Sequence, residues 1–306
     1  MKKIIIDCDP GHDDAVAIML AYAHKEDLKL VAITTVCGNN TLDKVTCNAL
    51  RTVAVCKETT AVYKGAQRPL LNPPVISSQY HGESGMDGPV YEEDIFLPTP
   101  GTLHAVDAMR EVVIESDAPI IIVALAPLTN LALFIRMYPE LLPRIECITL
   151  MGGGIDHGNI THSAEFNIYV DPEAAEIVFA SGVPVVMSGL DVTEKATLQV
   201  ADIEHLRNGG RQGRFFCELM DFYTLGSSAF GAEGCMLHDP CALLWLIRPD
   251  LFQGRRGNIR IILSGERRGQ TVFTPGEEES VLVLNDVKTK EFSDIVINSI
   301  ERLNKG

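Results

Sequence analysis

Basic residues are scarce in this 306-residue sequence, where 26 Lys and Arg stand against 41 Asp and Glu and give a formal net charge of −15. Nucleic-acid backbones and anionic membrane surfaces select for basic proteins, so this deficit excludes both as the main partner. No run approaches the roughly 18 apolar residues of a membrane-spanning helix. The three isoleucines before Asp7 are too few for the apolar core of a signal peptide. We therefore expect a cytoplasmic protein.

Metal-binding cysteine pairs and phosphate-binding glycine motifs are also absent. The eight cysteines include no C-x-x-C pair and no zinc-type spacing, and several lie in apolar runs, which favours reduced, buried thiols. The run Gly152-Gly153-Gly154 matches neither G-x-G-x-x-G nor a Walker A loop. The segment Gly82-Glu83-Ser84-Gly85 lacks the spacing of a nucleophile elbow. These patterns give no support to a zinc, dinucleotide or serine-hydrolase site.

Short apolar runs alternate with longer helical patterns along the whole chain. The predicted strands are Lys3–Ile6, Leu30–Val36, Ile120–Leu125, Cys147–Met151, Val183–Met187, Ile259–Leu263 and Val281–Leu284. The first five lack an alternating polar face, which is typical of strands covered on both sides by helices. Helices are predicted at Thr41–Cys56, at Thr102–Ser116, from the Asp171-Pro172 start signal onward, and at Lys288–Leu303.

This alternation predicts a single α/β domain over residues 1–306, with a mainly parallel, Rossmann-like open sheet flanked by helices. Two stretches, Lys64–Pro100 and Gly226–Leu237, show no regular pattern. Loops this long in a compact domain are often lids or binding loops. In such a sheet, ligands bind beyond the carboxyl ends of the strands, so we expect the active site there.

The strongest polar cluster follows the first predicted strand and contains Asp7, Asp9, Asp13 and Asp14. Four carboxylates this close repel one another, and gathering them in a partly dry site is costly without a cation. A hard divalent ion with oxygen ligands, calcium or magnesium, removes that cost. A helix dipole explains Asp13 and Asp14 but not Asp7 and Asp9, so the metal interpretation is preferred.

Other polar segments are weaker when each is taken alone. Glu165 and Asn167 lie on one face of an apparently extended stretch, as an ordinary solvated face would place them. Asp239 precedes Pro240 and an apolar helix, so by itself it is typical of an N-cap residue. His12 and His81 lie in Gly-rich or polar segments, where a surface position is the default expectation.

Taken together, these segments resemble the nucleoside hydrolases, the inosine–uridine and pyrimidine ribonucleoside N-glycosidases. The similar segments cover nearly the whole chain in the same order and include Asp7–Ala15, Gly38-Asn39, Ala126–Asn130, Leu150–Gly153, Ala164–Asn167, Asp171–Ala175 and His238-Asp239-Pro240. His81–Pro89 is similar to the subgroup that prefers pyrimidine ribonucleosides.

The resemblance implies hydrolysis of a ribonucleoside to free base and ribose, with one Ca²⁺ per subunit. Its implied calcium ligands are Asp9, Asp14, Asp239 and the main-chain carbonyl of Leu125, and Asp9 is also the implied general base toward calcium-bound water. The implied ribose-binding residues are Asp13, Asn39, Met151, Asn159, Glu165 and Asn167, supported from behind by Asp7. His238 is implied beside the base, and His81 is the second candidate for assisting its departure. Relatives are commonly homodimers or homotetramers.

The sequence departs from the family between Phe222 and Leu237, where relatives of the pyrimidine subgroup have a longer segment over the base. Tyr223 and Phe230 are the candidate substitutes. Two other functions stay open from the residues alone. A magnesium-dependent phosphohydrolase also begins with Asp-x-Asp after its first strand, and a non-catalytic ribose- or nucleoside-binding protein would keep the same sugar site.

Overall fold

The computed structural model describes residues 1–91, 95–228, 234–276 and 280–305 and contains one large sheet of nine strands. Its strand order is β10-β9-β11-β6-β5-β4-β1-β2-β3. The strands are β1 (Lys2–Cys8), β2 (Leu28–Thr35), β3 (Val62–Lys64), β4 (Ile120–Ala124), β5 (Ile145–Met151), β6 (Val185–Ser188), β9 (Phe252–Ile261), β10 (Thr271–Pro275) and β11 (Val281–Val287). A small second sheet pairs β7 (Thr197–Leu198) with β8 (Cys235–Met236).

Most of the large sheet is parallel, as the strand–helix alternation predicts. From β11 to β3 every neighbouring pair is parallel, and only β9 pairs antiparallel with β10 and β11 at one edge. The central strand β4 is buried along its whole length, which explains its uninterrupted apolar sequence. Successive side chains of β1 alternate between the two faces, with Ile4 and Ile6 in one core cluster and Ile5 in the other.

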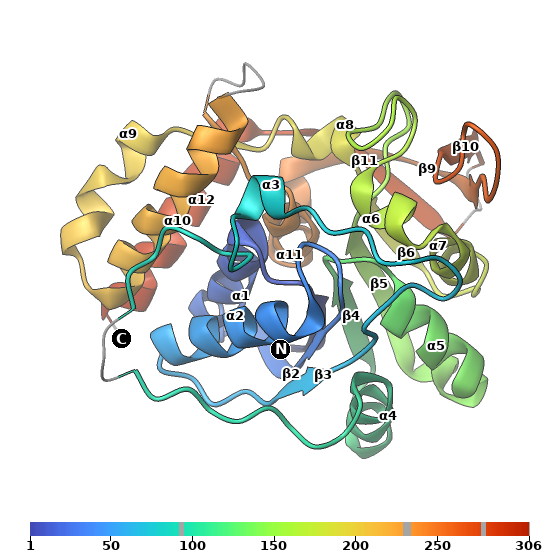
Figure 1. Cartoon of the computed structure of the whole chain (residues 1–306), viewed down its shortest axis with the longest axis horizontal. Helices are drawn as coiled ribbons and strands as arrows, with labels where there is room; N and C mark the ends of the chain where they lie inside the picture. Colours follow the sequence, from blue (N-terminus) through green and yellow to red (C-terminus); the bar gives the residue numbers. More distant parts are fainter. Residues whose placement is uncertain (92–94, 229–233, 277–279, 306) are drawn as a thin grey trace.

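Helices cover both faces of the sheet (Figure 1). One face packs against α1 (His12–Ala23), α2 (Leu42–Val55), α10 (Arg211–Ser228), α11 (Asp239–Ile247) and α12 (Thr289–Lys305). The other face packs against α4 (Ala105–Glu115), α5 (Thr129–Met137) and α7 (Pro172–Phe179). Shorter helices are α3 (Ser78–His81), α6 (Phe166–Val170), α8 (Leu190–Thr193) and α9 (Val200–Ile203), with 3-10 turns at Pro139–Arg144, Glu204–Asn208 and Pro249–Leu251.

All seven predicted strands and all four predicted helices are present with shifted ends. The sequence analysis missed β3 and β10, which are short, partly exposed strands near the two sheet edges, and it found only the end of β9. The irregular stretch Lys64–Pro100 contains α3 as its one helix among the described residues. Phe230 lies outside the described residues.

The described part of the chain holds no helix that combines the length and the apolar character needed to cross a membrane. All eight cysteines are free, and all but Cys47 are buried, which confirms the expectation of reduced thiols. The carboxyl ends of β1, β2, β4, β5 and β6 share one edge of the sheet, because these strands are parallel and adjacent. The polar segments that follow them therefore meet at this edge.

Candidate active site

Acidic side chains from both ends of the chain meet at this edge. Asp13 and Asp14 lie in the first turn of α1, and Asp239 is the first residue of α11. One carboxylate oxygen from each lies within 4.8 Å of the others, and all three residues are buried. The interpretation of Asp239 as an N-cap is wrong: His238 occupies the cap position, and Asp239 directs its carboxylate to the acidic cluster instead.

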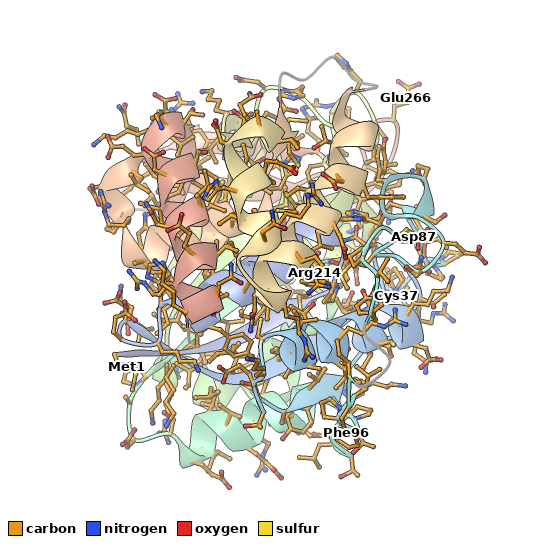
Figure 2. The ribbon with its side chains drawn as sticks, turned by 90° about the vertical axis from the view of Figure 1, so that its left-hand side faces the viewer. Met1, Cys37, Asp87, Phe96, Arg214 and Glu266 are labelled. Atoms are coloured by element: carbon orange, nitrogen blue, oxygen red, sulfur yellow. The ribbon has the colours of Figure 1, made fainter. Side chains whose placement is uncertain are left out.

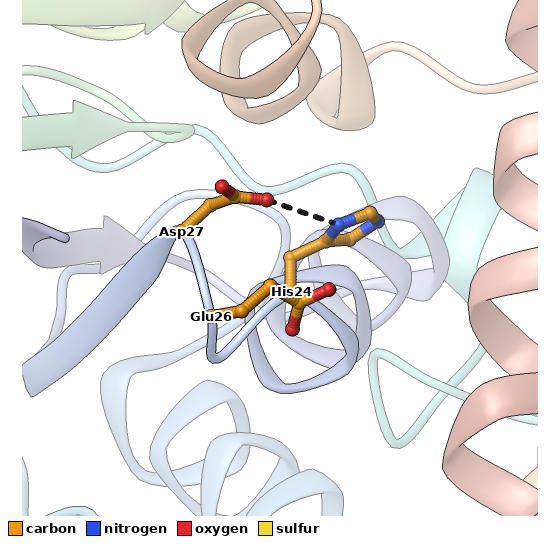
Figure 3. A group of neighbouring side chains, drawn as sticks. All are labelled: His24, Glu26 and Asp27. Carbon is orange, nitrogen blue, oxygen red and sulfur yellow. Dashed lines mark ion pairs between the residues drawn. The ribbon is translucent and has the colours of Figure 1, made fainter.

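The described residues contain one other group of this kind, formed by His24, Glu26 and Asp27 (Figure 3). There the His24 ring faces the Asp27 carboxylate, with Nδ1 and Oδ2 3.9 Å apart, and both acids are exposed. Arg302 forms an ion pair with Glu26 and donates to the Ala23 carbonyl at 3.2 Å. This guanidinium already compensates the charge of Glu26, and both acids are exposed to solvent, so the buried cluster is the better cation site.

Backbone and amide groups hold two of the acids firmly. The Asp14 carboxylate accepts hydrogen bonds from the backbone N–H groups of Asp9 (3.1 Å) and Gly11 (3.0 Å), which fixes the turn between β1 and α1. The Asp9 carboxylate accepts from the Asn39 backbone N–H at 2.6 Å. A side chain at position 38 would clash with Asp9 Oδ2, so Gly38 is what allows this close approach.

Asn39 bridges the acids to the irregular stretch after β3. Its Nδ2 donates toward Asp14 Oδ2 at 3.3 Å and the Asp9 carbonyl at 3.2 Å. Its Oδ1 accepts from the Ser77 hydroxyl at 3.0 Å, and the Ser77 backbone N–H donates to the Asn39 carbonyl at 3.2 Å. Ser77 thus fixes which way the Asn39 amide faces. The sequence analysis missed Ser77, because it lies in the stretch without a regular pattern.

The acids of this cluster resist ionisation. Burial raises the pKa of Asp9, Asp14 and Asp239, and the charges of neighbouring aspartates raise it further; the value for Asp14 is about 7. Asp7 lies behind them on β1, where burial raises its pKa to about 7. Its Oδ1 accepts from Thr34 (2.6 Å) and Asn130 (2.8 Å), whereas Oδ2 has no hydrogen-bond partner among the described residues.

Replacing Asp7 with Asn should stabilise the protein in a chelator at neutral pH. The folded pKa of Asp7, about 7, is above its ordinary 3.8, so its contribution to stability is full below pH 4 and is lost as the pH rises to about 7. Asn cannot ionise, and its Oδ1 can keep both hydrogen bonds. We expect Asp7→Asn to raise the free energy of unfolding at pH 8 by about 1–3 kcal/mol.

Urea unfolding at pH 4 and pH 8 measures this effect. The gain should nearly vanish at pH 4, and the exposed control Asp43→Asn should change stability by less than about 0.5 kcal/mol at either pH. A gain of equal size at both pH values would show that the effect is not due to ionisation of Asp7.

A cavity of about 420 Å³ opens above the acidic cluster. It is lined by ten of the candidate residues: Asp13, Asn39, His81, Leu125, Met151, Asn159, Glu165, Asn167, His238 and Asp239. Asp7, Asp9 and Asp14 are not part of this lining and are buried beneath it. The candidate set therefore occupies one place in the fold, with some residues on the cavity wall and the others supporting it.

Hydrogen bonds fix the polar wall formed by the segment around α6. Asn167 Nδ2 donates to the carbonyls of Leu125 and Met151, each at 3.1 Å, and so joins α6 to the ends of β4 and β5. Glu165 accepts from the backbone N–H groups of Asn167 (2.9 Å) and Gly153 (2.8 Å). Burial raises the pKa of Glu165. Asn159 Oδ1 accepts from the Phe166 N–H at 2.9 Å.

The expectation that Glu165 and Asn167 share a solvated extended stretch is wrong. Glu165 is the N-cap of α6, and Asn167 is the second residue of that helix. Both are buried, with exposed fractions of 2% and 5%. A helix of five residues is too short for its periodicity to be recognised, and the side chain of Glu caps helices less often than Asp, Ser or Thr.

Aromatic and imidazole side chains, among them His81, His238 and Tyr223, form another wall of the cavity. His81, at the end of α3, has its ring stacked with those of His12 and Tyr223, at centroid distances of 5.3 and 5.7 Å. His238 Nδ1 lies 2.8 Å from the Thr193 hydroxyl. Burial lowers the pKa of His12, His81 and His238, and the value for His81 is about 4. The surface expectation for His12 and His81 is wrong, since both rings are buried.

Some further residues that line the cavity belong to no motif that the sequence analysis identified. These are Ser77, Tyr80, Gly158, Ile160, Glu194 and Met236. Phe166, which lies in the Ala164–Asn167 segment, and Leu190 line the cavity as well. Tyr223, one of the two candidate substitutes over the base, also lines the cavity. Leu190 lies two residues beyond the last residue of β6, so the rule that ligands bind at strand ends was sufficient to find it.

The residues present fit a hard divalent cation. Every group of the acidic cluster is an oxygen donor, and Leu125, whose carbonyl accepts from Asn167 Nδ2, lines the same cavity as Asp13 and Asp239. Burial and mutual repulsion oppose ionisation of these acids, and Asp7 Oδ2 is left without a hydrogen-bond partner in the described part of the chain. A bound cation removes the repulsion, and an all-oxygen donor set favours calcium or magnesium over zinc or copper.

Comparison with known proteins agrees with this architecture. Residues 4–294 match the family model described as inosine-uridine preferring nucleoside hydrolase. The chain belongs to the nucleoside hydrolase family, and it is a ribonucleoside hydrolase that acts on N-glycosyl bonds. It is 44% identical to the pyrimidine-specific ribonucleoside hydrolase RihA of Salmonella schwarzengrund over 97% of this chain and 98% of that protein. It is 43% identical to RihA of Salmonella agona with the same coverage.

Solved structures of the family have the same fold. The plant nucleoside hydrolase PpNRh1 superposes with a TM-score of 0.90 at 30% identity, over 98% of both chains. The purine-preferring ribonucleoside hydrolase from Gardnerella vaginalis gives a TM-score of 0.91 at 30% identity, over 99% of both chains. These findings confirm the predicted family and the mainly parallel open sheet.

Proposed function

We propose that this enzyme hydrolyses the N-glycosidic bond of pyrimidine ribonucleosides, uridine and cytidine first among them, to free base and ribose. The observation that carries the proposal is the cavity itself. It is lined by the acids Asp13 and Asp239, by Asn and Glu side chains suited to sugar hydroxyls, and by two histidines. In this role the enzyme would act in nucleoside catabolism and pyrimidine salvage, with a free ribonucleoside as its substrate.

In the proposed mechanism Asp9 accepts the proton of the attacking water. Burial and the charge of Asp14 raise the pKa of Asp9 in the metal-free protein. A bound cation would favour the ionised carboxylate, which is the form that can accept a proton. The hydrogen bond from the Asn39 N–H at 2.6 Å keeps the carboxylate in place.

Asp9, Asp14, Asp239 and the carbonyl of Leu125 are the groups we assign to one calcium ion per subunit. When bound, this ion would keep the acids ionised and lower the pKa of the attacking water. Asp14 is already held by two backbone N–H groups at 3.0 and 3.1 Å, so its orientation does not depend on the ion. Asp7 supports the cluster from behind.

Cleavage of the glycosidic bond develops positive, oxocarbenium-like charge on the ribose. Asp13, Glu165 and Asp239 line the cavity and stabilise that charge from one side. Asn39, Asn159 and Asn167 complete the proposed ribose site, with Met151 against the sugar ring. Hydrogen bonds fix the orientation of these amides. They therefore cannot turn to bond with one another when a substrate lacks one of the ribose hydroxyls.

The departing base needs a proton or a hydrogen-bond donor, and we assign this role to the histidine wall. His81 and His238 both line the cavity. Thr193 orients His238 through the 2.8 Å contact to its Nδ1. Burial lowers the pKa of both rings, so a proton bound to either one is readily given to the base.

A preference for pyrimidines is supported by the named activity of the 43–44% identical RihA proteins and by the His81–Pro89 segment. Steady-state release of free base from uridine, cytidine, inosine, adenosine and guanosine tests it. Uridine and cytidine should have the highest kcat/KM. If inosine is the best substrate instead, the proposed preference is wrong while nucleoside hydrolysis stands.

Uridine 5′-monophosphate should be a poor substrate. The charged residues that line the cavity within the described ranges are Asp13, Glu165, Glu194 and Asp239, all acidic. A phosphate in or near this cavity is repelled, so we expect kcat/KM to be lower than for uridine by about 100-fold or more. Uracil release from the two compounds measures the ratio. Comparable rates would contradict the acidic character that we assign to the site.

The two other functions raised from the sequence receive no support from these comparisons. Family membership and the named relatives identify an N-glycosyl hydrolase, so neither a magnesium phosphohydrolase nor a binding protein without catalysis is retained. The homodimer or homotetramer implied by the family stays a prediction, which sedimentation equilibrium tests.

A further inference from the structure

The ring of His12 is held at both of its nitrogens. His12 is the first residue of α1 and is fully buried. Its Nε2 lies 2.8 Å from the carbonyl oxygen of Asp87, which is on the loop after α3 (Figure 2), and its Nδ1 lies 3.0 Å from His81 Nδ1. The Phe222 ring stacks parallel to it, with 5.1 Å between centroids. These contacts leave the imidazole one orientation.

These contacts determine where the protons lie. A carbonyl oxygen only accepts hydrogen bonds, so His12 Nε2 carries a proton, and the Nδ1 of the neutral ring has a lone pair. The contact between the two Nδ1 atoms needs one proton, which must then be on His81. The His12 backbone N–H also points to His81 Nδ1, but at 3.4 Å it is a longer and weaker contact.

We propose that His12 is a positioning residue that fixes the tautomer of His81. With Nδ1–H of His81 held by His12, Nε2 is the ring nitrogen that exchanges a proton. This inference rests on the proposed role of His81 toward the departing base. Before the step, His81 Nε2 takes a proton from solvent, so that the ring carries a proton on each nitrogen. In the step, the C–N glycosidic bond breaks with its electron pair going to the base, Nε2 transfers its proton to that base, and Nδ1–H remains with His12. After product release, the proton that Asp9 took from water restores His81 through solvent.

Two substitutions of similar size separate this role from simple packing. In His12→Asn, Oδ1 takes the place of Nδ1 and can still accept from His81. In His12→Gln, Nε2 can still donate to the Asp87 carbonyl, but the acceptor for His81 is lost. We expect His12→Gln to lower kcat on uridine by about 10- to 100-fold with KM changed less than about threefold, and His12→Asn to stay within about fivefold of the wild type.

A substrate with an activated leaving group provides the second readout. Hydrolysis of p-nitrophenyl riboside releases p-nitrophenolate, a stable anion that needs no proton to leave. Both His12 variants should therefore hydrolyse this substrate within about threefold of the wild-type rate. His81→Ala should behave like His12→Gln on both substrates. The ¹⁵N NMR spectrum of the wild type should in addition show His81 protonated at Nδ1 and His12 at Nε2.

Three outcomes would overturn the inference. The first is that His12→Asn and His12→Gln lose kcat on uridine equally. The second is that either variant loses as much of the wild-type rate on p-nitrophenyl riboside as on uridine. The third is a His81→Ala variant that hydrolyses uridine at the full rate, which would also remove the proposed role of His81. Nucleoside hydrolysis itself is tested independently, since a wild type that releases another base from its ribonucleoside but no uracil from uridine would contradict only the proposed pyrimidine preference.

Discussion

Asp9→Asn should abolish uracil release from uridine, with kcat lower by at least about 10³-fold, while the protein stays folded. An amide cannot take a proton from water at neutral pH, so the base of the reaction is lost. The fold should survive, because Asn Oδ1 can still accept the 2.6 Å hydrogen bond from the Asn39 N–H. Steady-state kinetics together with circular dichroism measure both parts of this expectation.

The calcium dependence of this variant separates the two roles assigned to Asp9. If Asp9 is the base, the loss persists when calcium is saturating. Recovery of more than about a tenth of the wild-type kcat at high calcium would instead make Asp9 a ligand only. Asp117→Asn, which removes an exposed carboxylate paired with Lys3, is the matched control and should leave the rate unchanged.

The second large effect concerns the sugar. 2′-Deoxyuridine should be hydrolysed with a kcat/KM about 10³-fold or more below that of uridine, because a site that binds a hydroxyl leaves buried polar groups unpaired when the hydroxyl is missing. The acids and amides that would lose their partner are rigidly held, as the 3.1 Å bonds of Asn167 illustrate.

The intrinsic reactivity of uridine and 2′-deoxyuridine predicts the opposite order of rates, which makes this comparison informative. The 2′-hydroxyl withdraws electrons and opposes positive charge on the sugar, so a deoxyribonucleoside is cleaved more easily without an enzyme. A slower enzymatic rate can therefore come only from lost contacts. The pair 5-methyluridine and thymidine has one base and differs only at the 2′ position, and it should show the same ratio. Equal rates within either pair would contradict the ribose site.

The position of the site could be predicted from sequence because of the sheet topology. Adjacent parallel strands end at one edge, so Asp9, Asn39, Leu125 and Met151 had to meet once their strands were recognised. Asp239 begins a helix far along the chain, and no local pattern indicates that its carboxylate joins Asp13 and Asp14. Only the resemblance to a known family indicated that contact.

The histidine wall shows the limit of local reasoning. His12 and His81 lie 69 positions apart, in segments typical of surface loops, yet their Nδ1 atoms are 3.0 Å apart and both rings are buried. That contact depends on the irregular stretch after β3 folding back over α1, and no periodicity encodes such a path. Glu165 was misjudged for a related reason, since its burial comes from the packing of a five-residue helix.

The central claim is that a calcium ion held by acids from both ends of the chain is required for catalysis. It is tested most directly by stripping the enzyme with a chelator, removing the chelator, and titrating calcium while uracil release from uridine is followed. The account predicts a rate at least about 10³-fold below that of the untreated enzyme, restored fully at one calcium ion per subunit. An undiminished rate in the stripped, metal-free enzyme would contradict it.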